Sequence, residues 1–426
     1  MSRVLAYTSP ARGHLFPVTP ILDELRSRGH DVTVRTLASE VDLMRSRGFA
    51  AEPIDPAIEA IEHDDWRERR PQAALRRAVR TFCARADHDA VDLQAAIEQA
   101  RPDACLVDIQ CWGALAAAEA WGGAWGAFCP YPLPLPSRDA PPFGPGLPPA
   151  RGPLGRLRDR ALRPLIFGAV ERIVVAELNG LRGRLDLEPV DASTMFTRPP
   201  LLLYMTAEPF EYPRSDWPAN VRLVGPCAWD PPVEPPPWLS DVQRPLVLVT
   251  TSSEFQDDDR LVRTALEALA GEDVEVVATL PAADATGFAV PANGRVLPFV
   301  PHAPLLAHAA CAITHGGMGA TQKAIARGVP VCVVPFGRDQ LEVARRVEVS
   351  GAGTRLPARR LTPARLRAKV RDAIARRQGA QQIAAAFARA GGPAAAADAF
   401  EERLLGRSRA PGGPPGGVPG AASARG

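Results

Sequence analysis

A histidine and a run of glycines stand together in the second half of the sequence. His315 is followed by Gly316, Gly317, Met318 and Gly319. Glycine lets a backbone approach a ligand closely, and the N–H groups at the start of a helix favour a negatively charged guest. The natural ligand is a phosphate or a pyrophosphate, to which His315 could add a hydrogen bond or a positive charge. A tight packing turn would show the same pattern, so these residues alone leave both interpretations open.

A second histidine and a carboxylate stand near the ends of two apolar runs in the first half. His14 follows the run 4–7, and Asp108 ends the run 102–108. In a parallel doubly wound sheet both positions face the same crevice, at the carboxyl ends of the strands. Each residue also has a plainer interpretation. A histidine in such a turn is by default a surface or capping residue, and Asp108 could cap the helix that starts near Trp112.

The elements around His315 have the order strand, glycine-rich turn, helix, strand. Residues 311–314 form a short apolar run, and residues 320–327 contain neither Gly nor Pro. Gly328 is placed as the C′ residue of that helix, and Pro330 prevents its continuation. The next strand is expected at 331–334. This arrangement puts the free N–H groups of the helix at the carboxyl edge of a sheet.

Both halves of the chain show an alternation of strands and helices. A turn through Pro17 is expected before the first helix, and Gly29 should end that helix. Further strands are expected at residues 4–7, 31–36, 201–205, 221–224, 246–250, 274–278 and 295–300. The proline density of residues 225–245 forbids a helix or a central strand and predicts a linker between two α/β domains.

Composition and charge exclude several classes of protein. The net charge of +2 gives no electrostatic case for nucleic acid binding. The seven cysteines are scattered and contain no CxxC pair, so a disulfide framework or zinc site is not expected. No run approaches the ~20 apolar residues of a membrane span, and the apolar run near the start is too short for the core of a signal peptide. We expect a cytoplasmic protein.

The run from His315 to Gly319, followed by Gly328-Val-Pro330 and then Asp339-Gln340, resembles the donor-sugar signature of the family-one glycosyltransferases. Gly13-His14, ahead of a helix that ends in Arg28-Gly-His30, is similar to the family as well. The antibiotic and macrolide glycosyltransferases of actinomycetes are members. The resemblance covers roughly residues 1–405 and is strongest at 295–356.

The resemblance implies an α/β protein of the GT-B fold, with two Rossmann-like domains that face each other across a cleft. The acceptor-binding domain would be 1–225, the proline-rich linker 226–245 and the nucleotide-sugar domain 246–380. The helices in 381–406 would pack back on the first domain, and the tail 407–426, rich in Gly, Pro, Ala and Ser, would be disordered.

The resemblance also implies roles for single residues. His14 would be the base that activates the acceptor hydroxyl, with Asp108 orienting its ring. Ser253 and the residues around His315 would hold the diphosphate, Phe299 and Val300 the base, and Asp339 and Gln340 the sugar. The donor-binding residues would be Ser253, Phe299, Val300, His315, Gly316, Gly317, Met318, Gly319, Ala320, Asp339 and Gln340. Acceptor-binding candidates are Trp66, Trp112, Phe128, Tyr131 and Phe143.

Departures from the family pattern bear on the donor. Ala320 stands where Ser or Thr is common, so a phosphate contact is missing unless Thr321 replaces it. Lys323 stands where a Glu often binds both ribose hydroxyls, and Phe299 and His302 replace the more frequent Trp and Gln. Because a nucleotide without a 2′-hydroxyl has less need of that Glu, we hypothesise a dTDP-sugar, with a UDP-sugar as the alternative.

No resident cofactor and no metal are expected, because the nucleotide-sugar is a co-substrate. The DxD pattern in 257–259 lies where a helix begins, so capping explains it better than metal binding. We therefore expect a metal-independent, inverting glycosyltransferase that moves a (deoxy)sugar to a small natural-product aglycone, as a monomer or homodimer. A nucleotide-sugar 2-epimerase and a non-catalytic sugar-nucleotide-binding auxiliary protein are the alternatives, and the presence of His14 argues against the second.

Overall fold

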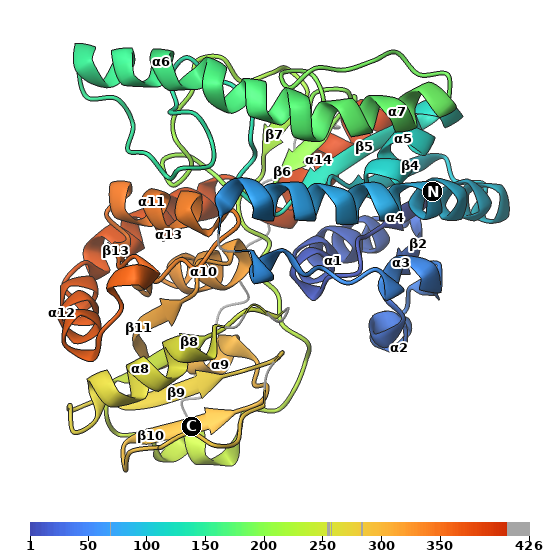
Figure 1. Cartoon of the computed structure of the whole chain (residues 1–426). Helices are drawn as coiled ribbons and strands as arrows, with labels where there is room; N and C mark the ends of the chain where they lie inside the picture. Colours follow the sequence, from blue (N-terminus) through green and yellow to red (C-terminus); the bar gives the residue numbers. More distant parts are fainter. Residues whose placement is uncertain (69, 254–255, 257, 283, 407–426) are drawn as a thin grey trace.

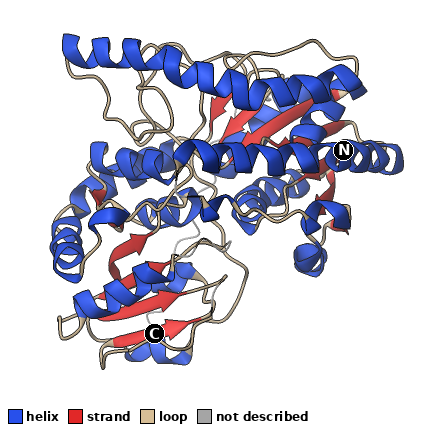
Figure 2. Ribbon diagram, in the orientation of Figure 1, coloured by secondary structure: helices blue, strands red, loops and turns tan. Residues whose placement is uncertain are grey.

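The computed structural model describes residues 1–68, 70–253, 256, 258–282 and 284–406. Its strands form two separate sheets, one in each half of the chain, and helices cover both sheets (Figure 1, Figure 2). Every strand pair in the described part of the chain is parallel. The expected α/β class with two sheet domains is confirmed.

The first sheet has seven strands in the order β3-β2-β1-β4-β5-β6-β7. The strands are β1 (Arg3–Tyr7), β2 (Asp31–Thr36), β3 (Ala50–Pro53), β4 (Ala104–Asp108), β5 (Ala124–Cys129), β6 (Leu202–Tyr204) and β7 (Val221–Leu223). The central strands are apolar on both faces, as parallel strands between two helix layers must be.

The second sheet has six strands in the order β10-β9-β8-β11-β12-β13. The strands are β8 (Leu246–Thr250), β9 (Glu275–Thr279), β10 (Gly294–Leu297), β11 (Ala309–Thr314), β12 (Val331–Val333) and β13 (Gly353–Arg355). In both sheets the strand order reverses direction beside the first strand, which is where doubly wound sheets bind ligands.

Helices connect the strands on both faces of each sheet. In the first half they are α1 (Arg12–Ser27), α2 (Val41–Ser46), α3 (Pro56–Ala60), α4 (Pro71–Ala100), α5 (Trp112–Trp121), α6 (Pro153–Val170) and α7 (Ala176–Arg184). In the second half they are α8 (Asp259–Leu269), α9 (His302–Ala307), α10 (Met318–Ala326), α11 (Gln340–Val349), α12 (Pro363–Ile374), α13 (Arg377–Arg389) and α14 (Gly392–Leu404).

The first helix begins earlier than the sequence predicts. α1 starts at Arg12 and contains Pro17 and Pro20, so His14 lies in its first turn and not in a loop ahead of it. A proline inside a helix removes one backbone hydrogen bond and can kink the helix without ending it, so Pro17 was a misleading boundary. The predicted end is correct, because Gly29 follows the C-cap with a φ of 87°.

The proline-rich stretch in 130–165 ends in a helix. α6 begins at Pro153, where proline is compatible with the first helical position. Figure 1 shows α6 as a long helix along one side of the molecule, next to α7. The residues before it, 130–152, form a loop that starts at the end of β5.

The two helices in 381–406 have different neighbours. Ile383 and Phe387 of α13 belong to the core of the second sheet, whereas Phe400 and Leu404 of α14 belong to the core of the first. The Arg28 side chain ties α14 to α1, because it donates hydrogen bonds to both Asp398 and Glu401. The tail 407–426 lies outside the described residues.

Within the described ranges, none of the helices combines the length and apolar character needed to cross a bilayer.

The crossing of α4 and α5 provides a stability test. A Cβ atom on Gly113 would lie 1.7 Å from the Ala86 carbonyl oxygen, whereas one on Gly180 in α7 would meet no atom within 4 Å. We expect Gly113→Ala to lower the free energy of unfolding by roughly 1–3 kcal/mol through overpacking. Gly180→Ala, the matched control, should be neutral or stabilising by up to about 1 kcal/mol. Urea denaturation measures both, and equal stability of the two variants would refute the close crossing.

Candidate active site

His14 and Asp108 form a hydrogen-bonded pair at the carboxyl edge of the first sheet. The Nδ1 atom of His14 lies 2.8 Å and 3.0 Å from the two carboxylate oxygens of Asp108. His14 comes from the first turn of α1, and Asp108 is the last residue of β4. Because β1 and β4 are adjacent and in register, the two turns that follow them meet.

Asp108 is completely buried and yet well supplied with hydrogen bonds. Its carboxylate accepts the backbone N–H groups of Ser9 and Gln110, each at 3.0 Å. Burial alone would raise the pKa of Asp108, but the charge of His14 and these hydrogen bonds hold that pKa below its usual value. The N-cap of α5 is Cys111, so Asp108 does not cap that helix, and its side chain is hydrogen-bonded to the His14 ring.

The glycine-rich turn joins β11 to α10 as the sequence predicts. Gly316 has a φ of 103°, and a Cβ there would lie 2.9 Å from the Cβ of Gln340, so only glycine fits. The helix starts at Met318 and ends before Gly328, whose φ is 70°. A Cβ on Gly319 would meet no atom within 4 Å, which leaves space in front of the first turn.

His315 lies beside this turn. The residue is only 7% exposed, and burial lowers the pKa of its imidazole while the charge of Asp258 opposes that shift. A neutral His315 can still donate one hydrogen bond to a bound anion. Thr321 does not replace the missing phosphate hydroxyl, because it is buried and its Oγ1 lies 3.0 Å from that of Thr314.

The residues expected to bind the sugar lie between β12 and the start of α11. Asp339 is half-buried, and burial raises the pKa of its carboxyl. The charges of Arg338 and His14 act in the opposite direction and limit this rise. Gln340 is 2% exposed and its amide is used within the protein. It accepts the N–H groups of Phe336 and Gly337 and donates to Gln256. Its role toward a sugar remains a prediction.

The carboxyl edges of the two sheets face each other at this point. A Cβ on Gly13, next to His14, would lie 3.9 Å from the Oγ of Ser253 in the second half. The Arg338 guanidinium donates to the Asp65 carboxylate at 2.7 Å and 3.1 Å, which joins the two halves beside Asp339. This pair could not be predicted, because nothing in the spacing of residues 65 and 338 indicates contact.

The segment expected to hold a nucleotide base is partly accessible. Phe299 is 46% exposed, whereas Val300 is buried. His302 points into the protein, where its Nε2 lies 3.2 Å from the Thr279 hydroxyl. Burial, together with the charge of Lys323, lowers the pKa of His302 to about 4.

Lys323 has a partner that the sequence did not reveal. Its ammonium group lies 2.5 Å from one oxygen of Asp230, a residue of the linker. The other oxygen of Asp230 accepts the N–H of Ala303 at 3.1 Å. Burial lowers the pKa of Lys323, and the negative charge of Asp230 opposes that shift. The linker thus contributes a carboxylate next to α9 and α10.

The predicted acceptor-binding aromatic residues are not all near the His14–Asp108 pair. The Tyr131 ring lies 5.7 Å from the His14 ring, between centroids. Phe128 is fully buried in the core of the first sheet, so its prediction as a lining residue is wrong. Trp66 packs under the guanidinium of Arg67, and Phe143 is half-buried in the loop 130–152.

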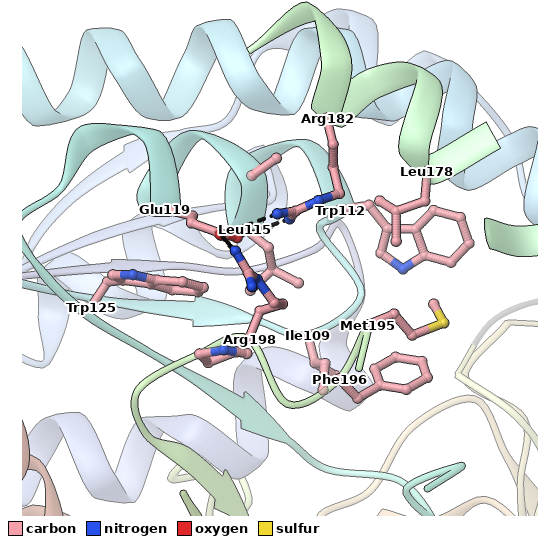
Figure 3. A pocket seen from close by; sticks show the side chains of 12 residues that line it. Ile109, Trp112, Leu115, Glu119, Trp125, Leu178, Arg182, Met195, Phe196 and Arg198 are labelled. Carbon is pink, nitrogen blue, oxygen red and sulfur yellow. Dashed lines mark hydrogen bonds and ion pairs between the residues drawn. The ribbon is translucent and has the colours of Figure 1, made fainter. Parts of the chain in front are cut away.

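Trp112 borders a small cavity, which Figure 3 shows between α5, α7 and the segment 195–199. The cavity of about 30 Å³ has room for water but not for an aglycone. Glu119 is held there by Arg182 and Arg198.

Among the residues described, no three His, Cys, Asp or Glu side chains gather as a metal site would need. Asp257 of the DxD pattern lies outside the described residues.

The chain matches the model of a family described as "Erythromycin biosynthesis protein CIII-like, C-terminal domain" over residues 263–402. A relative, 4′-demethylrebeccamycin synthase of Lentzea aerocolonigenes, is 36% identical over 394 residues, which are 88% of this chain and 92% of the relative. UDP-glycosyltransferase 2 of Phaeomoniella chlamydospora is 35% identical over 260 residues, 57% of this chain and 56% of its own length.

Solved structures show the same fold. The calicheamicin glycosyltransferase CalG4 superposes with a TM-score of 0.72 at 23% identity, covering 96% of this chain and all (100%) of that one. The glycosyltransferase VinC in complex with dTDP superposes with a TM-score of 0.68 at 22% identity, covering 95% and 100%.

The position of the His315 ring can be tested through its glycine neighbour. A Cβ on Gly317 would lie 2.6 Å from the Nε2 of His315, so Gly317→Ala must displace the ring. We expect a loss of about tenfold in affinity for thymidine or uridine diphosphate, the value of one hydrogen bond, measured by calorimetry. Gly317→Ala combined with His315→Ala should lose no more than His315→Ala alone. If the losses of affinity in Gly317→Ala and His315→Ala add up in the double variant, the effect of Gly317→Ala comes from the backbone and not from the ring.

Proposed function

The chain belongs to the family-one glycosyltransferases of the GT-B fold, and from that premise we propose that it transfers a sugar from a dTDP-sugar to a hydroxyl group of its acceptor, with inversion at the anomeric carbon. The protein is a nucleotide-sugar glycosyltransferase that acts on natural-product aglycones. The observation that carries the proposed mechanism is the His14–Asp108 pair next to Ser253 and Asp339 of the second half.

His14 is the proposed general base. With Nδ1–H donating to Asp108, the Nε2 atom carries the lone pair that takes the proton of the acceptor hydroxyl. The acceptor oxygen then forms a bond to the anomeric carbon as the bond from that carbon to the diphosphate oxygen breaks. Asp108 stabilises the imidazolium that results. General-base catalysis of this kind contributes about 10²–10⁴-fold in rate.

The departing diphosphate takes the electron pair of the broken bond and gains negative charge. The N–H groups at the start of α10 and the ring of His315 are the proposed donors to it. Such fixed donors stabilise the transition state without reorganisation, which is the role that a divalent metal has in other enzymes. Asp339 is the proposed acceptor for sugar hydroxyls, because it is half-buried and its electrostatic neighbours include His14.

The preference for dTDP rests on Lys323. Lys323 stands where related enzymes have a carboxylate that binds both ribose hydroxyls. Its ammonium group forms an ion pair with Asp230. The Asp230 carboxylate already accepts hydrogen bonds at both oxygens, so it is a poor partner for two further hydroxyls. A deoxyribose, which offers one hydroxyl fewer than ribose, suits this arrangement better.

A mass-spectrometric screen tests the proposal. The purified chain is incubated with dTDP-sugars and UDP-sugars, each against a panel of aromatic and macrolide aglycones. We expect acceptor products that gain one sugar, formed faster from dTDP-sugars. Products from UDP-sugars alone would overturn the donor assignment. Conversion of the nucleotide-sugar to an isomer in the absence of any aglycone would support the epimerase alternative and contradict transfer.

A further inference from the structure

A buried cluster of charged side chains joins the two halves of the molecule away from His14. We define this interdomain cluster as Tyr204, Glu211, Arg214, Glu342 and Arg346. The first three belong to the first half, and Glu342 and Arg346 belong to α11. Glu211 is 0%, Arg346 1% and Glu342 2% exposed. Side chains that bear full charges are rarely buried to this extent unless they are paired.

Arg346 is at the centre of the interdomain cluster. Its guanidinium donates to both oxygens of Glu211, at 2.8 Å and 2.9 Å, and to Glu342 at 2.9 Å. Arg214 also donates to Glu211, at 3.1 Å. Burial would raise the pKa of Glu211, but the charge of Arg346 lowers it to about 2. Two positive and two negative charges therefore compensate each other where water is excluded.

Glu342 also binds the loop 130–152 through its other carboxylate oxygen. Its Oε1 accepts the N–H groups of Gly144 and Gly146, at 2.8 Å and 2.9 Å, from the loop 130–152. Arg345, also on α11, donates to the carbonyl oxygen of Gly146 at 2.8 Å. A Cβ on Gly146 would lie 2.5 Å from the carbonyl oxygen of Leu341, so the approach of loop and helix requires glycine.

The same loop begins next to the proposed base. Tyr131 packs against His14, and two residues later the N–H of Leu133 donates to the hydroxyl of Tyr204 at 3.0 Å. Arg214 donates to the carbonyl oxygen of Leu135 at 3.2 Å. The interdomain cluster therefore fixes the loop both near His14 and at Gly144–Gly146.

We propose that Glu342 is a positioning residue that couples the acceptor side to the donor side. It sits three residues after Asp339, on the helix that starts at Gln340. While Glu342 holds Gly144 and Gly146, the loop 130–152 can open only if the two halves separate. Gly13 of the first half lies against Ser253, a proposed diphosphate contact, so a bound nucleotide would lie between the halves and oppose that separation. Nucleotide binding would then order the loop, and by linkage an ordered loop would favour the nucleotide. This inference rests on the proposed nucleotide site.

Hydrogen exchange of the full chain tests the coupling with dTDP as the probe. If loop opening requires release of the nucleotide, amides in 140–150 should exchange about 100-fold more slowly at a dTDP concentration of 100 times its dissociation constant. In Glu342→Ala the loop loses the two hydrogen bonds of Gly144 and Gly146 to the carboxylate and keeps the Arg345 hydrogen bond, so its amides should exchange faster and the slowing by dTDP should fall well below 100-fold. Glu342→Gln retains an acceptor oxygen and should restore part of the protection. Arg346 keeps both oxygens of Glu211 in these variants, so the chain should still fold.

Glu275→Ala is the matched control. Glu275 is a buried carboxylate that binds Arg244 of the linker and Arg295 of the second half, and its replacement should leave the exchange of 140–150 unchanged. If dTDP slows the exchange of amides in 140–150 equally in Glu342→Ala and in the wild type, the inference is overturned. Exchange in 315–326 reports nucleotide binding separately. Lack of protection there by both dTDP and UDP would overturn the proposed function, whereas unchanged exchange of 140–150 in Glu342→Ala would overturn the coupling alone.

Discussion

The proposed chemistry depends on a carboxylate that has no exposed surface. Asp108 accepts hydrogen bonds from Ser9, from Gln110 and from the ring of His14. A buried charge is costly unless it is fully hydrogen-bonded, so each of these donors is needed. The turn after β1, the turn after β4 and the first turn of α1 are therefore fixed relative to one another. His14 is held in one tautomer and one direction, which general-base catalysis requires.

In the second half of the chain, backbone N–H groups are proposed to stabilise a bound anion. The start of α10 and the buried His315 are the proposed donors to an anion, and the glycines leave out side chains that would block its approach. Arg338 reaches Asp65 across the boundary, and Arg346 reaches Glu211. Both ion pairs join the first half of the chain to the second.

Much of the fold and part of the site could be predicted from the sequence. Gly328 ends α10 as expected, because a left-handed residue after a helix is readable from one position. Phe128 was misassigned because a strand buried on both faces shows no alternation that would tell its two sides apart. The pairing of Lys323 with Asp230 could not be predicted, since it joins residues 93 positions apart. The internal use of the Gln340 amide likewise depends on backbone N–H groups whose directions only the folded chain defines.

In the proposed mechanism the charge of Asp108 makes His14 a base and does not contribute to nucleotide binding. The most direct measurement compares the transfer rate and the dTDP affinity of Asp108→Asn with those of the wild type, using an acceptor identified by mass spectrometry. We expect a fall in kcat of about 10²–10⁴-fold, the contribution of a general base, with the dissociation constant of dTDP unchanged. Transfer at the wild-type rate by Asp108→Asn would show that His14 does not need the charge of Asp108.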